Sequence, residues 1–241
     1  MSLPERIAQW LREYLESAGA DGFVFGLSGG VDSATVAALA VRAVGTDRVL
    51  AAVLPCHSPS DDLHLARRVA ETFGIPTVTV DLTPIYDALV AVLPPTEHAL
   101  ARANIKPRLR MIALYYLAQS HHYLVLGSGN RSEISVGYYT KYGDGGVDLL
   151  PLGGLYKTQV WQLARELGVP QEVIDRPPTA GLWPGQTDEG EMGITYRELD
   201  RILAAMAVGD LSGLDPAAVE KVRGMMVRSE HKRRMPPIFE P

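Results

Sequence analysis

The stretch Gly26-Leu27-Ser28-Gly29-Gly30-Val31-Asp32-Ser33 decides the fold, because it stands where an apolar strand ends and a helix begins. Two consecutive glycines let backbone N–H groups approach an anion closely, and the helix N-terminus supplies partial positive charge. The hydroxyls of Ser28 and Ser33 add further hydrogen-bond donors. The stretch therefore predicts a phosphate-binding loop at a junction between a strand and a helix.

The spacing of this loop distinguishes it from two other phosphate-binding loops. It lacks the lysine and the GxxxxGK[ST] spacing of the ATPase P-loop, and it does not match GxGxxG. It is similar instead to the pyrophosphate-binding loop of the N-type ATP pyrophosphatases, which split ATP into AMP and pyrophosphate. A carboxylate beside a triphosphate is repulsive unless Mg²⁺ lies between them, so Asp32 implies a metal. The alternative is a tight structural turn in which Asp32 only favours the helix dipole.

Outward from the loop, apolar runs alternate with helical patterns. Strands are predicted at residues 22–27, 49–54, 77–82 and 123–126. Helices are predicted at residues 1–15, 33–44, 60–73 and 105–122, and Ser60 is expected to cap the third. Strands that are apolar on both faces and separated by helices favour an α/β fold, a doubly wound, Rossmann-like parallel sheet with helices on both faces.

Beyond Pro151 the strand pattern ends and a helical C-terminal part is predicted, with helices at 157–167, 196–207 and 216–228. Residues 176–193 contain three prolines and four glycines, and we expect them to form a mobile lid. The whole chain, 1–241, is expected to be one domain, and it has no spare length for a glutaminase domain.

Composition narrows the function further. Apolar residues make up 46% of the chain and charged residues 21%, as in ordinary globular proteins, and the lone Cys56 cannot form an intramolecular disulfide. The net charge of −5 argues against a broad nucleic-acid-binding face. The amphipathic N-terminus lacks the apolar core of a signal peptide, and no apolar run is long enough to cross a membrane. We therefore expect a cytoplasmic enzyme without a nucleic-acid or membrane partner.

Two later segments carry further candidate site residues. The segment Gly127-Ser128-Gly129-Asn130-Arg131-Ser132-Glu133 follows the last strand, and ligands of doubly wound sheets bind where strands end and the winding reverses. If the first and last strands are neighbours, Glu133 supplies a second Mg²⁺ carboxylate and Ser128 a hydroxyl. The glycine-rich segment 137–160 adds Lys141 and Lys157 as candidate phosphate partners. From sequence alone, the same lysines could equally be solvated charges on a surface loop.

Taken together, the chain resembles the ammonia-dependent NAD synthetases. The resemblance extends over nearly the whole chain, in the blocks 28–33, 104–111, 127–133, 139–148, 155–160, 177–189 and 229–234. It implies that deamido-NAD is amidated by ammonia, with ATP as co-substrate, through an adenylated intermediate that yields NAD, AMP and pyrophosphate. It also implies a C–N bond-forming ligase that acts as a homodimer, with the helix 105–122 near the dimer contact and the substrate bound near the subunit interface.

The same resemblance implies a role for individual residues. Residues 26–33 would bind ATP together with Ser128, Lys157 and Thr179, while Asp32 and Glu133 hold Mg²⁺. The residues implied in deamido-NAD binding are Arg108, Lys141, Asp148, His231 and Lys232. Asp32 and Lys157 would be catalytic, and Asp144 would handle ammonium.

Two other classes of protein share parts of this pattern. Another ATP pyrophosphatase, such as a GMP synthetase core or a tRNA thiolase, would use the same loop, but the later blocks argue against both. A thiolase would also need catalytic cysteines and a basic RNA-binding face. A nucleotide sensor without turnover could share the fold, yet it would need neither paired metal carboxylates nor a lid.

Overall fold

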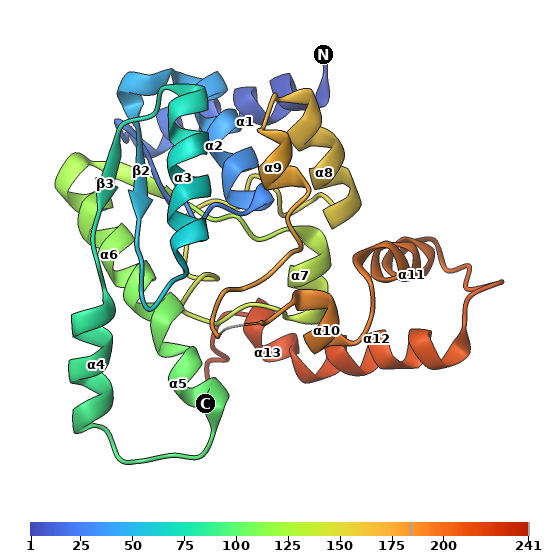
Figure 1. The fold of residues 1–241 in the computed structure, drawn as a ribbon. Coiled ribbons are helices and arrows are strands. Elements are labelled where there is room, and N and C mark those ends of the chain that lie inside the picture. Colours follow the sequence, from blue (N-terminus) through green and yellow to red (C-terminus); the bar gives the residue numbers. More distant parts are fainter. Residues whose placement is uncertain (184, 241) are drawn as a thin grey trace.

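A four-stranded parallel sheet forms the centre of the protein in a computed structural model that describes residues 1–183 and 185–240 (Figure 1). The strand order is β3-β2-β1-β4. The strands are β1 (Gly22–Gly26), β2 (Val49–Val53), β3 (Thr77–Thr79) and β4 (Tyr123–Leu126). The first and last strands are therefore neighbours, which brings the loops that follow them to one edge of the sheet.

The sheet is buried because its strands are apolar on both faces. Phe23 and Phe25 of β1 pack into one cluster of buried side chains, and Val24 packs into another on the opposite face. Phe23 pairs with Val49 of β2 and with Leu124 of β4. β1 lies between β2 and β4 in the sheet, and the phosphate-binding loop begins at its carboxyl end.

Helices cover both faces, which confirms the doubly wound α/β fold. One face carries α1 (Leu3–Ala18), α2 (Val31–Val44), α3 (Ser60–Phe73), α8 (Lys157–Glu166) and α9 (Gln171–Ile174). The other face carries α4 (Thr83–Val92) and α6 (Ile105–His121), and α5 (Ala99–Ala103) leads into α6. The structure agrees with the expectation that crossover helices lie between parallel strands.

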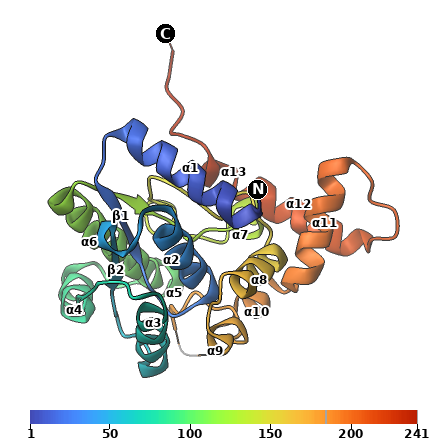
Figure 2. The same cartoon turned by 90° about the horizontal axis from the view of Figure 1, so that it is seen from above.

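The helical C-terminal part packs beside the sheet domain rather than on the sheet (Figures 1 and 2). It contains α10 (Asp188–Met192), α11 (Tyr196–Val208), α12 (Pro216–Arg228) and α13 (Glu230–Arg233). A third apolar cluster joins α11 and α12 to α7 (Arg131–Val136), the short helix after β4. Among the described residues beyond Pro151 no strand occurs, as the sequence predicted.

Several local predictions were wrong. The third strand ends at Thr79 rather than at residue 82, although the N–H groups of Val80 and Leu82 still donate to carbonyls at or just beyond the end of β2, at 3.0 and 2.8 Å. The Asp81 carboxylate then accepts the Thr83 N–H at 2.9 Å, where α4 begins. Ser60 is the first residue of α3 and makes no capping hydrogen bond, since Pro59 holds the cap position. The helix predicted from residue 33 begins at Val31, with Gly30 as its cap.

Most of the expected lid, residues 176–193, is irregular and ends in α10. Pro184 within it and Pro241 at the C-terminus lie outside the described residues. No helix in the described ranges is long and apolar enough to cross a membrane.

Candidate active site

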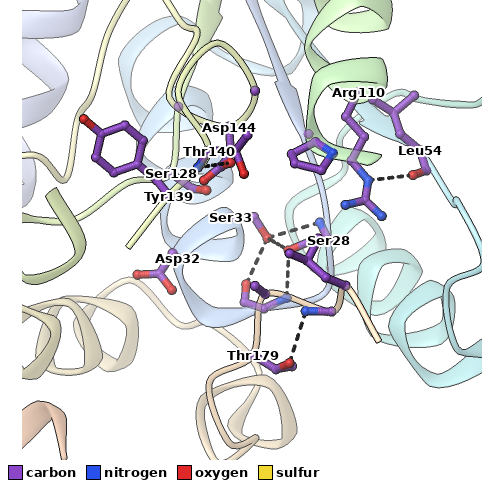
Figure 3. Close-up of a pocket in the computed structure, with 18 of the residues that line it drawn as sticks. Ser28, Asp32, Ser33, Leu54, Arg110, Ser128, Tyr139, Thr140, Asp144 and Thr179 are labelled. Atoms are coloured by element: carbon purple, nitrogen blue, oxygen red, sulfur yellow. Dashed lines mark hydrogen bonds between the residues drawn. The ribbon is translucent and has the colours of Figure 1, made fainter. Parts of the chain in front are cut away.

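A cavity of about 420 Å³ opens at the carboxyl ends of β1, β2 and β4. It is lined by the phosphate-binding loop, by residues of the segment 126–144 and by residues of the lid. In Figure 3, Ser28 and Ser33 face each other at the start of α2, Thr179 approaches from the lid, and Ser128, Thr140 and Asp144 lie across from them. The two loops predicted to meet do so in this cavity.

Hydrogen bonds within the phosphate-binding loop fix its shape. The Ser28 N–H donates to the Ser33 hydroxyl at 3.2 Å, and that hydroxyl donates to the Gly30 carbonyl at 3.0 Å. The Gly30 N–H donates to the Ser28 hydroxyl at 3.3 Å. The loop is thus ordered by its own serines at the N-terminus of the 14-residue helix α2, where an anion is favoured.

Gly29 is required at its position for two independent reasons. Its φ of +79° lies in the left-handed region that glycine adopts without strain. A Cβ there would also lie 2.6 Å from the Asp62 carbonyl oxygen of α3. The loop therefore packs directly against the backbone of α3.

Lys157, the first residue of α8, is the buried cation of the site. It is 1% exposed, and its Nζ lies 2.5 Å from Asp32 Oδ2 and 3.5 Å from Glu133 Oε1. Burial alone would lower the pKa of Lys157, but the two carboxylates outweigh it and raise that pKa above its usual value. Lys157 therefore stays charged at the edge of the phosphate-binding loop.

Asp32 and Glu133 provide the oxygen donors that Mg²⁺ prefers. Burial and the nearby Asp32 charge raise the pKa of Glu133 to about 8, so the single charge of Lys157 does not fully compensate the two carboxylates. Among the described residues no group of three or more Asp, Glu, His or Cys is placed to hold a metal. Two carboxylates nevertheless fit Mg²⁺, which takes its other ligands from substrate phosphates and water.

Three residues that the sequence did not single out support this group. The buried Asn130 side chain donates to Asp32 Oδ1 at 3.0 Å and accepts the Glu133 N–H at 3.1 Å, so it caps α7 and joins the two carboxylates. The buried Tyr196 hydroxyl lies within hydrogen-bond distance of two carboxylates, 3.3 Å from Glu133 and 3.0 Å from Asp188. Burial raises the pKa of Asp188 as well, and its Oδ1 has no hydrogen-bond partner among the described residues.

The lid lies across the cavity and is attached to two other elements. Arg176 forms an ion pair with Asp62 of α3, and Lys106 of α6 donates to the Leu182 carbonyl at 2.8 Å. Thr179 accepts the Gly181 N–H at 3.1 Å, which folds the lid into a turn facing the phosphate-binding loop. Thr179 thus lines the same cavity as the phosphate-binding loop.

Asp144 and Lys232 lie on the wall opposite the phosphate-binding loop. Asp144 is open to the cavity but surrounded by protein, and this desolvation raises its pKa. Lys232 donates to the carbonyls of Gly137 and Tyr139 at 2.7 Å each, which holds its ammonium at the cavity wall. A carboxylate and an ammonium group thus line the same part of the cavity.

The other expected deamido-NAD residues do not line this cavity. Arg108 donates to the Lys141 carbonyl at 3.4 Å, and Lys141 donates to the His231 carbonyl at 2.6 Å, so these three residues form one group near the surface. Asp148 accepts the Tyr115 hydroxyl at 2.9 Å and the Val125 N–H at 2.8 Å. Of the residues expected to bind deamido-NAD, only Lys232 therefore lines the cavity within a single chain.

With this geometry established, comparison with known proteins gives a consistent result. The model of the family described as NAD synthase matches residues 3–236. The chain belongs to the NAD synthase family. A related NH(3)-dependent NAD(+) synthetase from Archaeoglobus fulgidus is 49% identical over 241 residues, which cover 97% of this chain and 94% of the relative.

Solved structures of the NAD synthase family share the fold. An NMN synthetase from Francisella tularensis superposes with a TM-score of 0.91 at 37% identity, covering 98% of this chain and 96% of that one. An NH3-dependent NAD synthetase from Campylobacter jejuni gives a TM-score of 0.86 at 29% identity, covering 99% and 98%. The agreement extends over nearly the full length of each chain.

Proposed function

We propose that this chain is a ligase that amidates the nicotinate carboxylate of deamido-NAD with ammonia, using ATP, to give NAD, AMP and pyrophosphate. The observation that carries the proposal is that the phosphate-binding loop, the Asp32–Lys157–Glu133 group and the Asp144–Lys232 wall share one cavity. That arrangement suits a triphosphate facing a second substrate. Two relatives that are 49% and 48% identical to this chain are named NH(3)-dependent NAD(+) synthetases, which supports ammonia as the nitrogen donor.

The first step needs no side-chain nucleophile. The substrate carboxylate attacks the α-phosphorus of ATP, the bond from that phosphorus to the bridging oxygen breaks, and pyrophosphate leaves. Lys157 and the loop N–H groups stabilise the negative charge of both reactants and align them, which lowers the barrier by orientation and electrostatics. Asp32 and Glu133 would hold Mg²⁺, and when bound the ion would further offset the charge of the phosphates.

In the second step ammonia attacks the acyl carbon of the adenylate, loses a proton, and displaces AMP. Asp144 is our candidate for binding ammonium and accepting that proton, because desolvation raises its pKa and so favours proton uptake. The lid that carries Thr179 would shield the adenylate from water.

We further propose that the described sheet and helices act as one catalytic domain in a cytoplasmic homodimer. Ile112 and Tyr116 of α6 are 59% and 72% exposed, on the helix that carries Arg108. A second copy against α6 would cover these apolar side chains and would bring a further surface to the Arg108–Lys141–His231 group. The dimer is tested by the mass of the purified chain in solution, and a monomer at working concentration would contradict it.

A mononucleotide is the second candidate substrate. The Francisella tularensis structure with the TM-score of 0.91 is named an NMN synthetase. Arg108, Lys141 and His231 lie outside the cavity, so the adenylyl half of a dinucleotide has few contacts inside a single chain.

Kinetics with both substrates separate these candidates. Purified chain with Mg-ATP and ammonium is given deamido-NAD or nicotinate mononucleotide, and kcat/KM is measured for each. A higher value with deamido-NAD supports the main proposal, and a higher value with the mononucleotide replaces it by the second. Turnover of neither would contradict both.

A further inference from the structure

A buried carboxylate outside the cavity connects the two helices that carry Glu133 and Lys157. Asp200 of α11 is 5% exposed and does not line the cavity. Its Oδ1 accepts a hydrogen bond from the Ser132 hydroxyl, and its Oδ2 accepts the Thr158 N–H at 2.9 Å. Among the described residues no lysine, arginine or histidine lies within salt-bridge distance of Asp200. Donors from two helices therefore compensate its charge.

Ser132 completes this connection. Its hydroxyl, 0% exposed, accepts the Lys157 N–H at 2.9 Å while donating to Asp200. The first two N–H groups of α8, which have no partner within the helix, are thus bound by Ser132 and Asp200. A negative charge at this end also favours the helix dipole. Ser132 directly precedes Glu133 in α7, so the same contacts fix the start of α8 and the position of Glu133.

We propose that Asp200 is a positioning residue that sets the placement of Lys157 relative to Glu133. Two acceptor oxygens are needed here, one for a hydroxyl and one for an N–H. An asparagine would turn its NH₂ group toward one of these donors, which would leave a buried donor unpaired. The site would shift even though the fold persists. This inference rests on the proposed function for its activity assay, and ATP binding tests it independently.

The test compares Asp200→Asn with a matched control, Asp215→Asn. Asp215 also binds two N–H groups at a helix start, those of Ala217 at 3.3 Å and Ala218 at 3.1 Å, but it lies at α12 on the surface. We expect Asp200→Asn to lower kcat about 10- to 100-fold, as loss of a residue that orients a ligand does. Titration calorimetry should show weaker ATP binding with and without Mg²⁺, while the KM for deamido-NAD stays unchanged. Asp215→Asn should change only the thermal midpoint.

A second variant keeps the test decisive if Asp200→Asn does not fold. Ser132→Ala removes the bridging hydroxyl but keeps the bond from Thr158 to Asp200, and it should weaken ATP binding and kcat in the same way. The double variant should lose no more ATP affinity and no more kcat than the more affected single variant, because both substitutions act through the same hydrogen bonds. Additive losses, or an Asp200→Asn protein with wild-type kcat and ATP affinity, would overturn the inference. A wild-type chain that binds ATP but forms no NAD would instead overturn the proposed function.

Discussion

Replacing Lys157 by methionine should destabilise the protein and stop the reaction. The substitution keeps most of the side-chain volume but removes the cation that lies between Asp32 and Glu133 in a site where Lys157 is 1% exposed. Breaking a buried ion pair by removing one partner costs about 3–5 kcal/mol. For a chain of this size, each kcal/mol corresponds to roughly 2–4 °C in Tm. The expected decrease in Tm is therefore roughly 6–20 °C.

The size of this loss should depend on pH. The pKa of Glu133 is raised to about 8 even though the nearby Lys157 charge lowers it, so removing that cation should raise the pKa further. Above pH 8 Glu133 loses its proton in the wild type but not yet in the variant, so the variant loses stability over a wider pH range and the difference in Tm should be larger at pH 9 than at pH 6. Scanning calorimetry at both pH values, without Mg²⁺, measures this. Lys221→Met, which removes a surface lysine bound to the Gly193 carbonyl, serves as the control.

The kinetic part of this prediction is equally specific. Loss of one charged group that stabilises the transition state lowers kcat about 10²- to 10³-fold. A Lys157→Met protein with wild-type Tm at pH 9 and near wild-type kcat would refute the structural role given to this lysine.

Three further predictions test other parts of the site. Asp32→Asn should leave the fold intact by circular dichroism and abolish turnover, because the pair of oxygen donors for Mg²⁺ is lost; near-normal activity would count against Asp32 as a ligand. Gly29→Ala should weaken ATP binding in calorimetry and destabilise the fold by about 1–3 kcal/mol. The reason is that φ is +79° at this position and the added Cβ would lie 2.6 Å from the Asp62 carbonyl oxygen. Unchanged ATP affinity would contradict the loop geometry. The metal-free wild type should lose stability as the pH rises from about 4.5 toward 8, since burial raises the pKa of Glu133, and Glu133→Gln should flatten that slope in urea titrations.

The central strands and the phosphate-binding loop could be predicted because local sequence specifies them. The apolar run that forms β1 and the double glycine after it need no distant partner to be recognised. That the two loops meet depended on β1 and β4 being neighbours, and the structure meets this condition. The third strand was predicted to be too long, to residue 82, because the apolar pattern of the sequence does not show where its pairing with β2 becomes irregular. Helices α4 and α5 were missed, since neither shows a long amphipathic pattern.

The supporting residues of the site could not be predicted in the same way. The hydrogen bond from Asn130 to Asp32 spans 98 positions of sequence, so no local pattern indicates it. Asp200 and Tyr196 lie in a helix whose pattern predicts only an amphipathic surface helix, and their contacts depend on how α11 packs against α7 and α8. The sequence identifies residues that stand in a recognisable local motif, whereas residues that act through contacts between distant elements can be identified only once the fold is known.

Transfer of an isotope from the substrate carboxylate tests the central claim most directly. Deamido-NAD with both carboxylate oxygens labelled with ¹⁸O is converted with Mg-ATP and ammonium. The masses of the AMP and NAD products are then measured by mass spectrometry. If the carboxylate attacks the α-phosphorus, each AMP gains one ¹⁸O and each NAD keeps one in its amide. Unlabelled AMP, or ADP and phosphate as products, would contradict the adenylated intermediate and the reaction assigned to this cavity.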